Sequence, residues 1–330
     1  MLHDCKKIVP SQLLHKHVCE TAQYNQHMTP KMKYLRYGIA LAVVVLYGLF
    51  ELYAAGSQAE YVLLAAGFLT MGIPHGALDH LLRRDKKNSL FIFIAEYVFI
   101  VVVYFIFWLF FPLFSLLFFL LFSAFHFGES EYEAYGIQSS SLGSYVKAVA
   151  LGLSILLFII ATHWSEATDI ILSYDPALRN LIRSKIFHQS MNLVAVLAYT
   201  YLVLQVLLSK GRKFTGLLFM LSLGILLPLA LSFGLYFVLQ HSWNAWLHMK
   251  KELKLSSWTL YKEAIPYTVG AVCILSLIFV VDSAVLPYSQ NIMSSIFTFL
   301  SCISLPHFLL MHLFYKQRKI EAVTTANSVM

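Results

Sequence analysis

Long apolar segments separated by short charged stretches are the dominant pattern of the chain. Many of these segments reach about 18 residues, the length that an α-helix needs to cross a bilayer. Runs such as 91–107 and 149–160 lack the alternation of apolar and polar positions that is typical of transmembrane β-strands. The pattern therefore predicts about ten transmembrane helices. They lie at about 35–55, 59–82, 89–110, 112–129, 145–163, 187–209, 214–232, 234–250, 264–282 and 291–315.

The composition agrees with this prediction. Hydrophobic residues make up 59% of the 330 residues and charged residues only 12%, whereas soluble domains carry about 25% charged residues. We predict an all-α fold, a polytopic integral membrane helical bundle. Residues 1–33 are expected to form an N-terminal tail, 34–316 the transmembrane domain and 317–330 a C-terminal tail. The tight joint at Ser232-Phe233-Gly234 predicts a hairpin between the seventh and eighth helices.

The net charge of +7 is explained by where the basic residues lie. With the N-terminus in the cytoplasm, nearly all Lys and Arg fall in inside segments, and the outer connection at 163–186 holds only Arg179, Arg183 and Lys185. Cytoplasmic loops carry such an excess of positive charge. We therefore expect both termini in the cytoplasm, a multi-pass location in the cell membrane (the inner membrane of a bacterium), contact with lipid, and no nucleic-acid partner.

Histidines are the candidate functional residues, because ionisable groups inside membrane spans are costly and usually face the bundle interior. Four of the predicted helices carry them: His75 and His80, His126, His241 and His248, and His307 and His312. His75, His241 and His307 precede their basic flanking residues by eight or nine positions, which is roughly 12–13 Å along a helix. Four helices thus offer imidazoles at a similar depth, which favours one shared site.

Imidazoles suit Zn, Cu, Fe or Ni. At about 100° per residue, His241 and His248 lie on one helix face, two turns apart, so both can point inward. His75 and His80 are about 140° apart and supply one inward ligand between them, as do His307 and His312. For His80 and His312, a role at the membrane interface near a helix end stays open.

Neighbouring residues complete the candidate site. Asp79 follows His75 by four residues and can accept an N–H from a ligand imidazole, the usual means of orienting a metal-bound histidine. Phe127 and Trp243 stand next to site histidines in the sequence and are candidates for the wall of an apolar cleft.

Four motifs, taken in their order along the chain, resemble those of the Brp/Blh β-carotene 15,15′-dioxygenases. They are Gly72-Ile73-Pro74-His75-Gly76-Ala77-Leu78-Asp79-His80, Phe125-His126-Phe127-Gly128, Tyr236-Phe237 running into His241-Ser242-Trp243, and Leu305-Pro306-His307. The resemblance covers roughly residues 70–315. It implies a membrane enzyme with non-haem Fe(II) that cleaves the central double bond of β-carotene with O₂ to two molecules of retinal. Its usual purpose is to supply a microbial rhodopsin.

The resemblance also implies iron ligands at His75, His126 and His241. The family commonly has a further histidine four residues after the one in its HS motif, where this chain has Ala245. We therefore predict His248, one turn further along, as the fourth ligand. His307 matches a family position as a pocket residue, a ligand-orienting residue or an alternative ligand, and we expect a substrate tunnel between helices, open to the bilayer.

Competing functions differ in what they need from the sequence. A di-iron desaturase needs HxxxH and HxxHH boxes, which are absent. A metal-transporting protein needs a polar path across the whole bilayer, but the outer halves of the histidine-bearing helices are almost entirely apolar. A carotenoid- or retinoid-binding protein without catalysis is the alternative that the sequence leaves open.

Overall fold

The computed structural model describes residues 30–53, 56–83, 89–135, 137, 141–209, 213–285 and 292–327, and every regular element in these ranges is a helix. Eight of the described helical segments are long and apolar enough to cross a membrane. They are Lys31–Leu52, Gln58–Leu82, Leu90–Phe110, Pro112–Ala134, Leu142–Thr162, Lys185–Leu208, Ser257–Val281 and Ile292–Gln317. The prediction of an all-helical, multi-pass membrane bundle is therefore confirmed. Most of the predicted N-terminal tail, residues 1–29, lies outside the described residues.

The elements follow one another along the chain without any strand between them, within the ranges just given. They are α2 (Pro30–Leu52), α3 (Gly56–Gly67), η2 (Phe68–Gly72), α4 (Ile73–Gly76), α5 (Asp79–Leu82), α6 (Leu90–Phe110), α7 (Pro112–Ala134), α8 (Leu142–Thr162), α9 (Trp164–Tyr174), η3 (Pro176–Leu178), α10 (Arg179–Ile182), α11 (Lys185–Leu208), α12 (Thr215–Gly224), α13 (Leu229–Tyr236), η4 (Phe237–Ser242), α14 (Trp243–Leu253), α15 (Ser257–Val285) and α16 (Ile292–Asn327).

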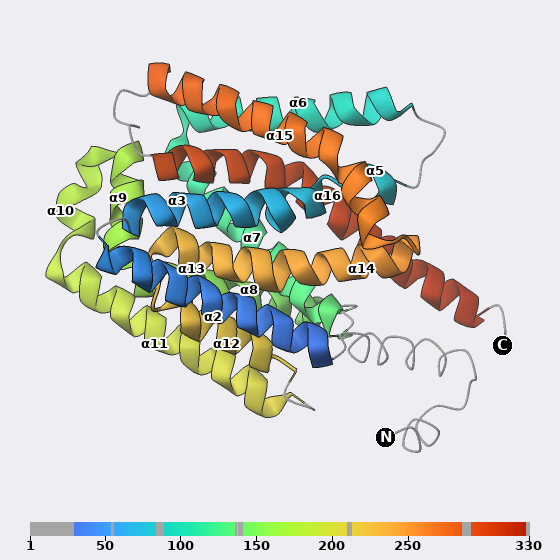
Figure 1. Cartoon of the computed structure of the whole chain (residues 1–330), viewed down its shortest axis with the longest axis horizontal. Coiled ribbons are helices and arrows are strands. Elements are labelled where there is room, and N and C mark those ends of the chain that lie inside the picture. Colours follow the sequence, from blue (N-terminus) through green and yellow to red (C-terminus); the bar gives the residue numbers. More distant parts are fainter. Residues whose placement is uncertain are drawn as a thin grey trace.

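The long helices run side by side along one axis of the molecule (Figure 1). The start of α2 and the end of α16 lie at the same end of the bundle (Figure 1). Helix α7 packs against α8 on one side and α16 on the other, and α16 also packs against α6 and α15. The site described below is built around α7, α16 and the segments η2–α4 and η4.

Helices α7 and α8 approach each other closely because both carry glycine at their contact. A Cβ on Gly128 would overlap the carbonyl oxygen of Ala148, and a Cβ on Gly152 would overlap that of Ala124. Small residues four apart allow membrane helices to bring their backbones together in this way. The glycine after His126-Phe127 is therefore a packing residue, and its close contact fixes the helix that carries His126.

The structure corrects the predicted seventh and eighth helices. The break falls at residues 225–228, just before α13, and the chain is helical through Gly234 and on to Leu253. Helix α3 packs closely against Gly234, and a Cβ there would lie 2.8 Å from Cδ1 of Leu64. The position therefore favours glycine. The ten residues of α12 span only about 15 Å, half the thickness of the hydrocarbon core.

Two π-helical segments, η2 and η4, pack against each other near the centre of the bundle. Short π-helical turns inside α-helices often occur at functional sites. Pro74 follows η2 and has no N–H, so it cannot donate to the carbonyl of Thr70 four residues earlier. The Tyr261 hydroxyl on α15 donates to this carbonyl at 2.9 Å. This hydrogen bond holds α15 against η2.

Candidate metal centre

Four histidines from four separate parts of the chain meet inside the bundle. His75 lies on α4, His126 on α7, His241 on η4 and His307 on α16. Their ring centroids are 5.3 Å apart for His75 and His241, 5.2 Å for His75 and His307, 5.0 Å for His126 and His241, and 5.2 Å for His126 and His307. Each is at most 7% exposed. We call these residues the four-histidine cluster.

The geometry of the cluster suits a metal ion. One nitrogen of each of His75, His241 and His307 lies within 4.8 Å of the others, and these three residues could hold an ion. His126 completes the cluster by its ring contacts with His241 and His307. Neutral imidazole is the commonest metal ligand in proteins, so the structure provides a buried site that could bind a metal.

Several imidazole nitrogens in the cluster have no hydrogen-bond partner among the described residues. They are both nitrogens of His126, both of His241, and Nε2 of His75. Leaving a buried polar group unsatisfied costs about 1–3 kcal/mol, so such groups are rare in proteins. Metal ligands are buried polar groups of this kind, because their partner is a metal ion and not another protein atom.

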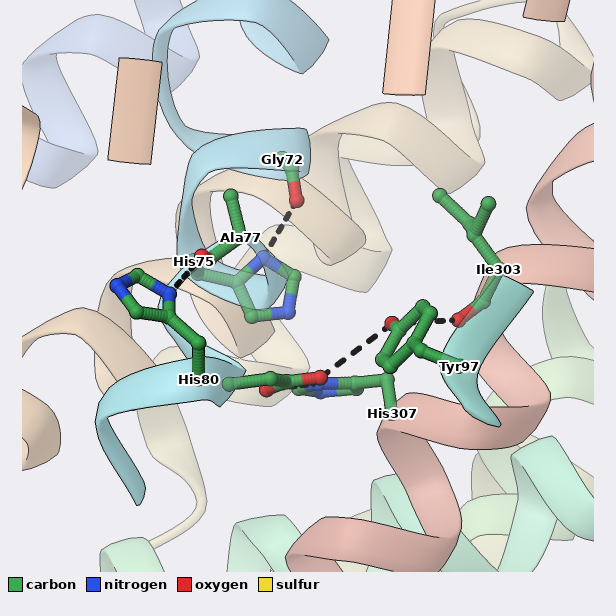
Figure 2. A network of polar contacts seen from close by, with 8 residues as sticks. Gly72, His75, Ala77, His80, Tyr97, Ile303 and His307 are labelled. Atoms are coloured by element: carbon green, nitrogen blue, oxygen red, sulfur yellow. Dashed lines mark hydrogen bonds and ion pairs between the residues drawn. The ribbon is translucent and has the colours of Figure 1, made fainter. Parts of the chain in front are cut away.

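The remaining nitrogens of the cluster are used to orient the rings. Nδ1 of His75 donates a hydrogen bond to the carbonyl oxygen of Gly72. Nδ1 of His307 donates to both carboxylate oxygens of Asp79, at 2.8 and 2.9 Å. Figure 2 shows the His75 and His307 rings turned toward each other from their two elements. Hydrogen bonds of this kind fix the tautomer and leave Nε2 free for a metal.

Tyr97 of α6 supports Asp79 in turn. Its hydroxyl lies 3.3 Å from Oδ2 of Asp79 and 3.2 Å from the carbonyl oxygen of Ile303, and the contact with Ile303 is drawn in Figure 2. The sequence prediction missed Tyr97. Its signal was weak, because a tyrosine among the phenylalanines of an apolar segment is not distinguished by any spacing.

The structure places the other predicted site residues as follows. Asp79 orients His307, whereas the sequence suggested His75 as its partner. His80 stacks on Tyr267 with ring centroids 4.1 Å apart, and its Nδ1 donates a hydrogen bond to the carbonyl oxygen of Ala77 at 3.0 Å. Phe127 contacts His241, with centroids 4.9 Å apart.

Two predicted residues do not join the cluster. His248 contacts Phe314 and Tyr315, at centroid distances of 6.2 and 5.9 Å. It follows His241 by seven residues, or about 10 Å along a helix, so the two side chains lie about two helical turns apart. The π-helical turn at His241 also alters the angle on which the prediction relied. Trp243 is partly buried against the apolar core and is not part of the cavity wall described next.

A cavity of about 520 Å³ adjoins the cluster. All four of its histidines line this cavity, together with Asp79, His80, Tyr97 and Phe127. The rest of the wall is mostly apolar and comes from η2, α4, α6, α7, η4, α15 and α16, with Phe122, Ile274 and Leu300 as examples. Cavities of this size hold small-molecule ligands. A long apolar molecule could lie here with one part beside the imidazoles.

Fold and site together define a multi-pass membrane protein with a buried histidine cluster that could bind a metal and that adjoins an apolar cavity. The family model for β-carotene 15,15′-dioxygenase matches residues 66–315, and the chain belongs to this family. It is an oxidoreductase that cleaves β-carotene centrally to retinal, with β-carotene and O₂ as substrates. The predictions of family and reaction are thereby confirmed. No curated protein and no solved structure shows a significant match to the chain.

Proposed function

We propose that His75, His126, His241 and His307 hold the ferrous iron with which this enzyme cleaves β-carotene. The observation that carries the proposal is the set of buried imidazole nitrogens without a described protein partner. His307 takes the place of His248 among the ligands, because His248 lies about two turns from His241 along its helix. The hydrogen bond to Asp79 leaves the other nitrogen of His307 available.

The chemistry of the reaction favours a redox-active metal such as iron over zinc. Zinc has no redox chemistry, and a reaction with O₂ needs a centre that exchanges electrons. Iron held by imidazoles alone keeps open coordination positions and would supply the activation of O₂. The protein residues have a different task, which is to bind and place the polyene.

The chain's own residues act by positioning and by excluding water. In a balanced dioxygenase reaction each carbon of the central double bond receives one oxygen atom, and no proton is gained or lost. No general acid or base is therefore required, and Asp79 and Tyr97 serve to hold His307. The apolar walls from α6, α7, α15 and α16 keep the polyene in a dry cavity beside the cluster.

The experiment is to express the chain in a bacterium that makes β-carotene and to separate the retinoids of its membranes by chromatography. We expect retinal with the intact chain and none with His126→Ala. Iron measured in the purified proteins should fall in the same variant. His188→Ala is the control, since this histidine on α11 lies outside the cavity wall and should leave retinal and iron unchanged.

The opposite result would favour another function. Folded, iron-loaded protein that leaves β-carotene intact would support a carotenoid- or retinoid-binding role without catalysis, and iron passing across vesicle membranes would support transport. Retinal formation by His126→Ala would remove this residue from the ligand set but leave the other three in place.

We further propose a ten-segment topology, in which α12 and the continuous helix from Leu229 to Leu253 join the eight long helices. Residues 34–316 would form the catalytic domain between two cytoplasmic tails, in a bacterial inner membrane. The product would feed a microbial rhodopsin. Labelling of single cysteines from each side of inverted and right-side-out vesicles tests the topology.

A further inference from the structure

The cavity reaches the outside of the bundle between α6 and α15. Its inner wall is formed by buried histidines. Its outer wall includes Ile94 and Val98 of α6, which are 36% and 39% exposed, and Pro266 and Gly270 of α15, which are exposed as well. Both helices contain candidate membrane spans. The opening therefore lies on the side of the bundle that lipid would cover, and not at either end.

Each helix presents one face to this opening. Ile94 and Val98 are four residues apart, and so are Pro266, Gly270 and Ile274. Residues at this spacing lie above one another on a helix. None of these five side chains is polar, so this part of the cavity mouth is apolar.

Gly270 lines the cavity on the α15 side and leaves space beside it. A Cβ at this position would have no heavy atom within 4 Å. Glycine is unfavourable in the middle of a helix relative to alanine, and here no neighbouring helix approaches closely enough to require it. The space that this glycine leaves is thus part of the opening.

We propose that β-carotene enters from the membrane through the opening between α6 and α15, and that Gly270 sets the width of this entrance. This inference rests on the proposed function. The ligand class is a rod-shaped hydrocarbon with a bulky ring at each end, dissolved in lipid. Such a molecule has to pass one ring through the entrance before its central double bond can reach the four-histidine cluster.

The test compares Gly270→Leu with Gly48→Leu in the full-length chain. Gly48 lies on α2, is exposed, and also has nothing within 4 Å of a built Cβ, so neither change should disturb the fold. We expect Gly270→Leu to lower retinal formation from β-carotene at least about 10-fold with unchanged iron content. Gly48→Leu should match the parent chain.

A substrate series separates the entrance from a general effect on the site. An apocarotenal that lacks one ring can enter with its open end first, so Gly270→Leu should slow its cleavage less than that of β-carotene. Loss should grow from Gly270→Ala through Gly270→Leu to Gly270→Trp. Equal loss for both substrates, or a fall in iron content, would overturn the proposal, as would full activity in Gly270→Trp.

A labelling experiment gives a readout that does not depend on catalysis. Val98→Cys, in a chain whose Cys5, Cys19 and Cys273 are replaced by Ser, should react with a membrane-soluble maleimide, and β-carotene should protect it. Val45→Cys, an exposed position on α2, is the control and should not be protected. If the intact chain makes no retinal, the proposed function fails, and protection or its absence at Val98→Cys still decides for or against the entrance.

Discussion

The two sides of the site are built in opposite ways, and each is marked by a glycine. Between α7 and α8, Gly128 brings two backbones together so closely that no side chain fits. Between α6 and α15, Gly270 faces open space. We call the first contact the closed side and the second the open side. On the closed side glycine fixes a helix, and on the open side glycine leaves room for a ligand.

The histidines of the two sides are positioned accordingly. The imidazole of His126 on α7 makes no hydrogen bond with the described residues, and its place is set by the packing of its helix against α8. His307 lies on α16, which packs against α6 and α15 of the open side. Its ring is held by Asp79 and, through Asp79, by Tyr97. On the closed side, close backbone packing positions His126, and on the open side, hydrogen bonds position His307.

Breaking the closed side should have the largest effect. Gly128→Ala adds a methyl group that would overlap the backbone of α8, and backbone cannot rotate away as a side chain does. Overpacking costs about 1–3 kcal/mol and occasionally more, and we expect the upper end, with little folded protein recovered. Unfolding in a denaturing detergent measures the free energy. Gly38→Ala on α2, where a Cβ meets nothing, should be within about 0.5 kcal/mol of the parent chain.

The next largest effect should come from His307→Ala. It removes one imidazole of the four-histidine cluster and leaves Asp79 without its partner, so we expect at least about a 100-fold loss of retinal formation together with loss of iron. The matched control is His248→Ala, which removes a histidine of similar burial, 7% exposed in both cases. Normal iron in His307→Ala and loss of iron in His248→Ala would reverse the assignment of the fourth ligand.

Depth along a helix can be counted from the sequence, and it indicated one shared site for the imidazoles of four helices. The motif resemblance implied His75, His126 and His241 as ligands, with His307 as a pocket residue, a ligand-orienting residue or an alternative ligand. His248 was predicted as the fourth ligand because it follows Ala245, the position of the family's usual histidine, by one turn on the helix face of His241. A shared face does not give the distance along the helix, which is about 10 Å from His241 to His248. The change from i→i−4 to i→i−5 hydrogen bonds in η2 and η4 is not marked by any residue type. The local geometry of His75 and His241 therefore could not be predicted from the sequence.

Glycine caused the remaining errors in the fold. Gly234 and its neighbours suggested a turn, but the structure continues the helix there, because Leu64 of α3 occupies the space that a side chain would need. From sequence alone, a glycine that ends a helix and a glycine that admits a neighbouring helix look the same. Pro228, which precedes α13, was the better signal for the break.

Weakening the open side's positioning should have an intermediate effect. Asp79→Asn keeps the shape of the side chain but removes the negative charge that holds the imidazole of His307. Changes to such ligand-orienting groups typically cost about 10- to 100-fold in metal affinity or activity. The rate of iron loss to a chelator measures this directly. Asp169→Asn, at an exposed carboxylate paired with Arg183, should leave that rate unchanged, and an unchanged rate in Asp79→Asn would exclude a positioning role.

The smallest effect should come from Tyr97→Phe, which removes one hydroxyl and preserves the ring that lines the cavity. The hydroxyl's bond to Asp79 is a single contact to a charged group, worth about 1.5–3 kcal/mol at most, and its length of 3.3 Å places it at the weak end. We expect about a 3- to 10-fold faster loss of iron and a similar fall in retinal formation. Combined with Asp79→Asn, the change should add little if Asp79 is the main route by which Tyr97 acts on His307. Full additivity in the double variant would mean that the hydroxyl acts through the carbonyl of Ile303 on α16 or on the substrate in the cavity instead.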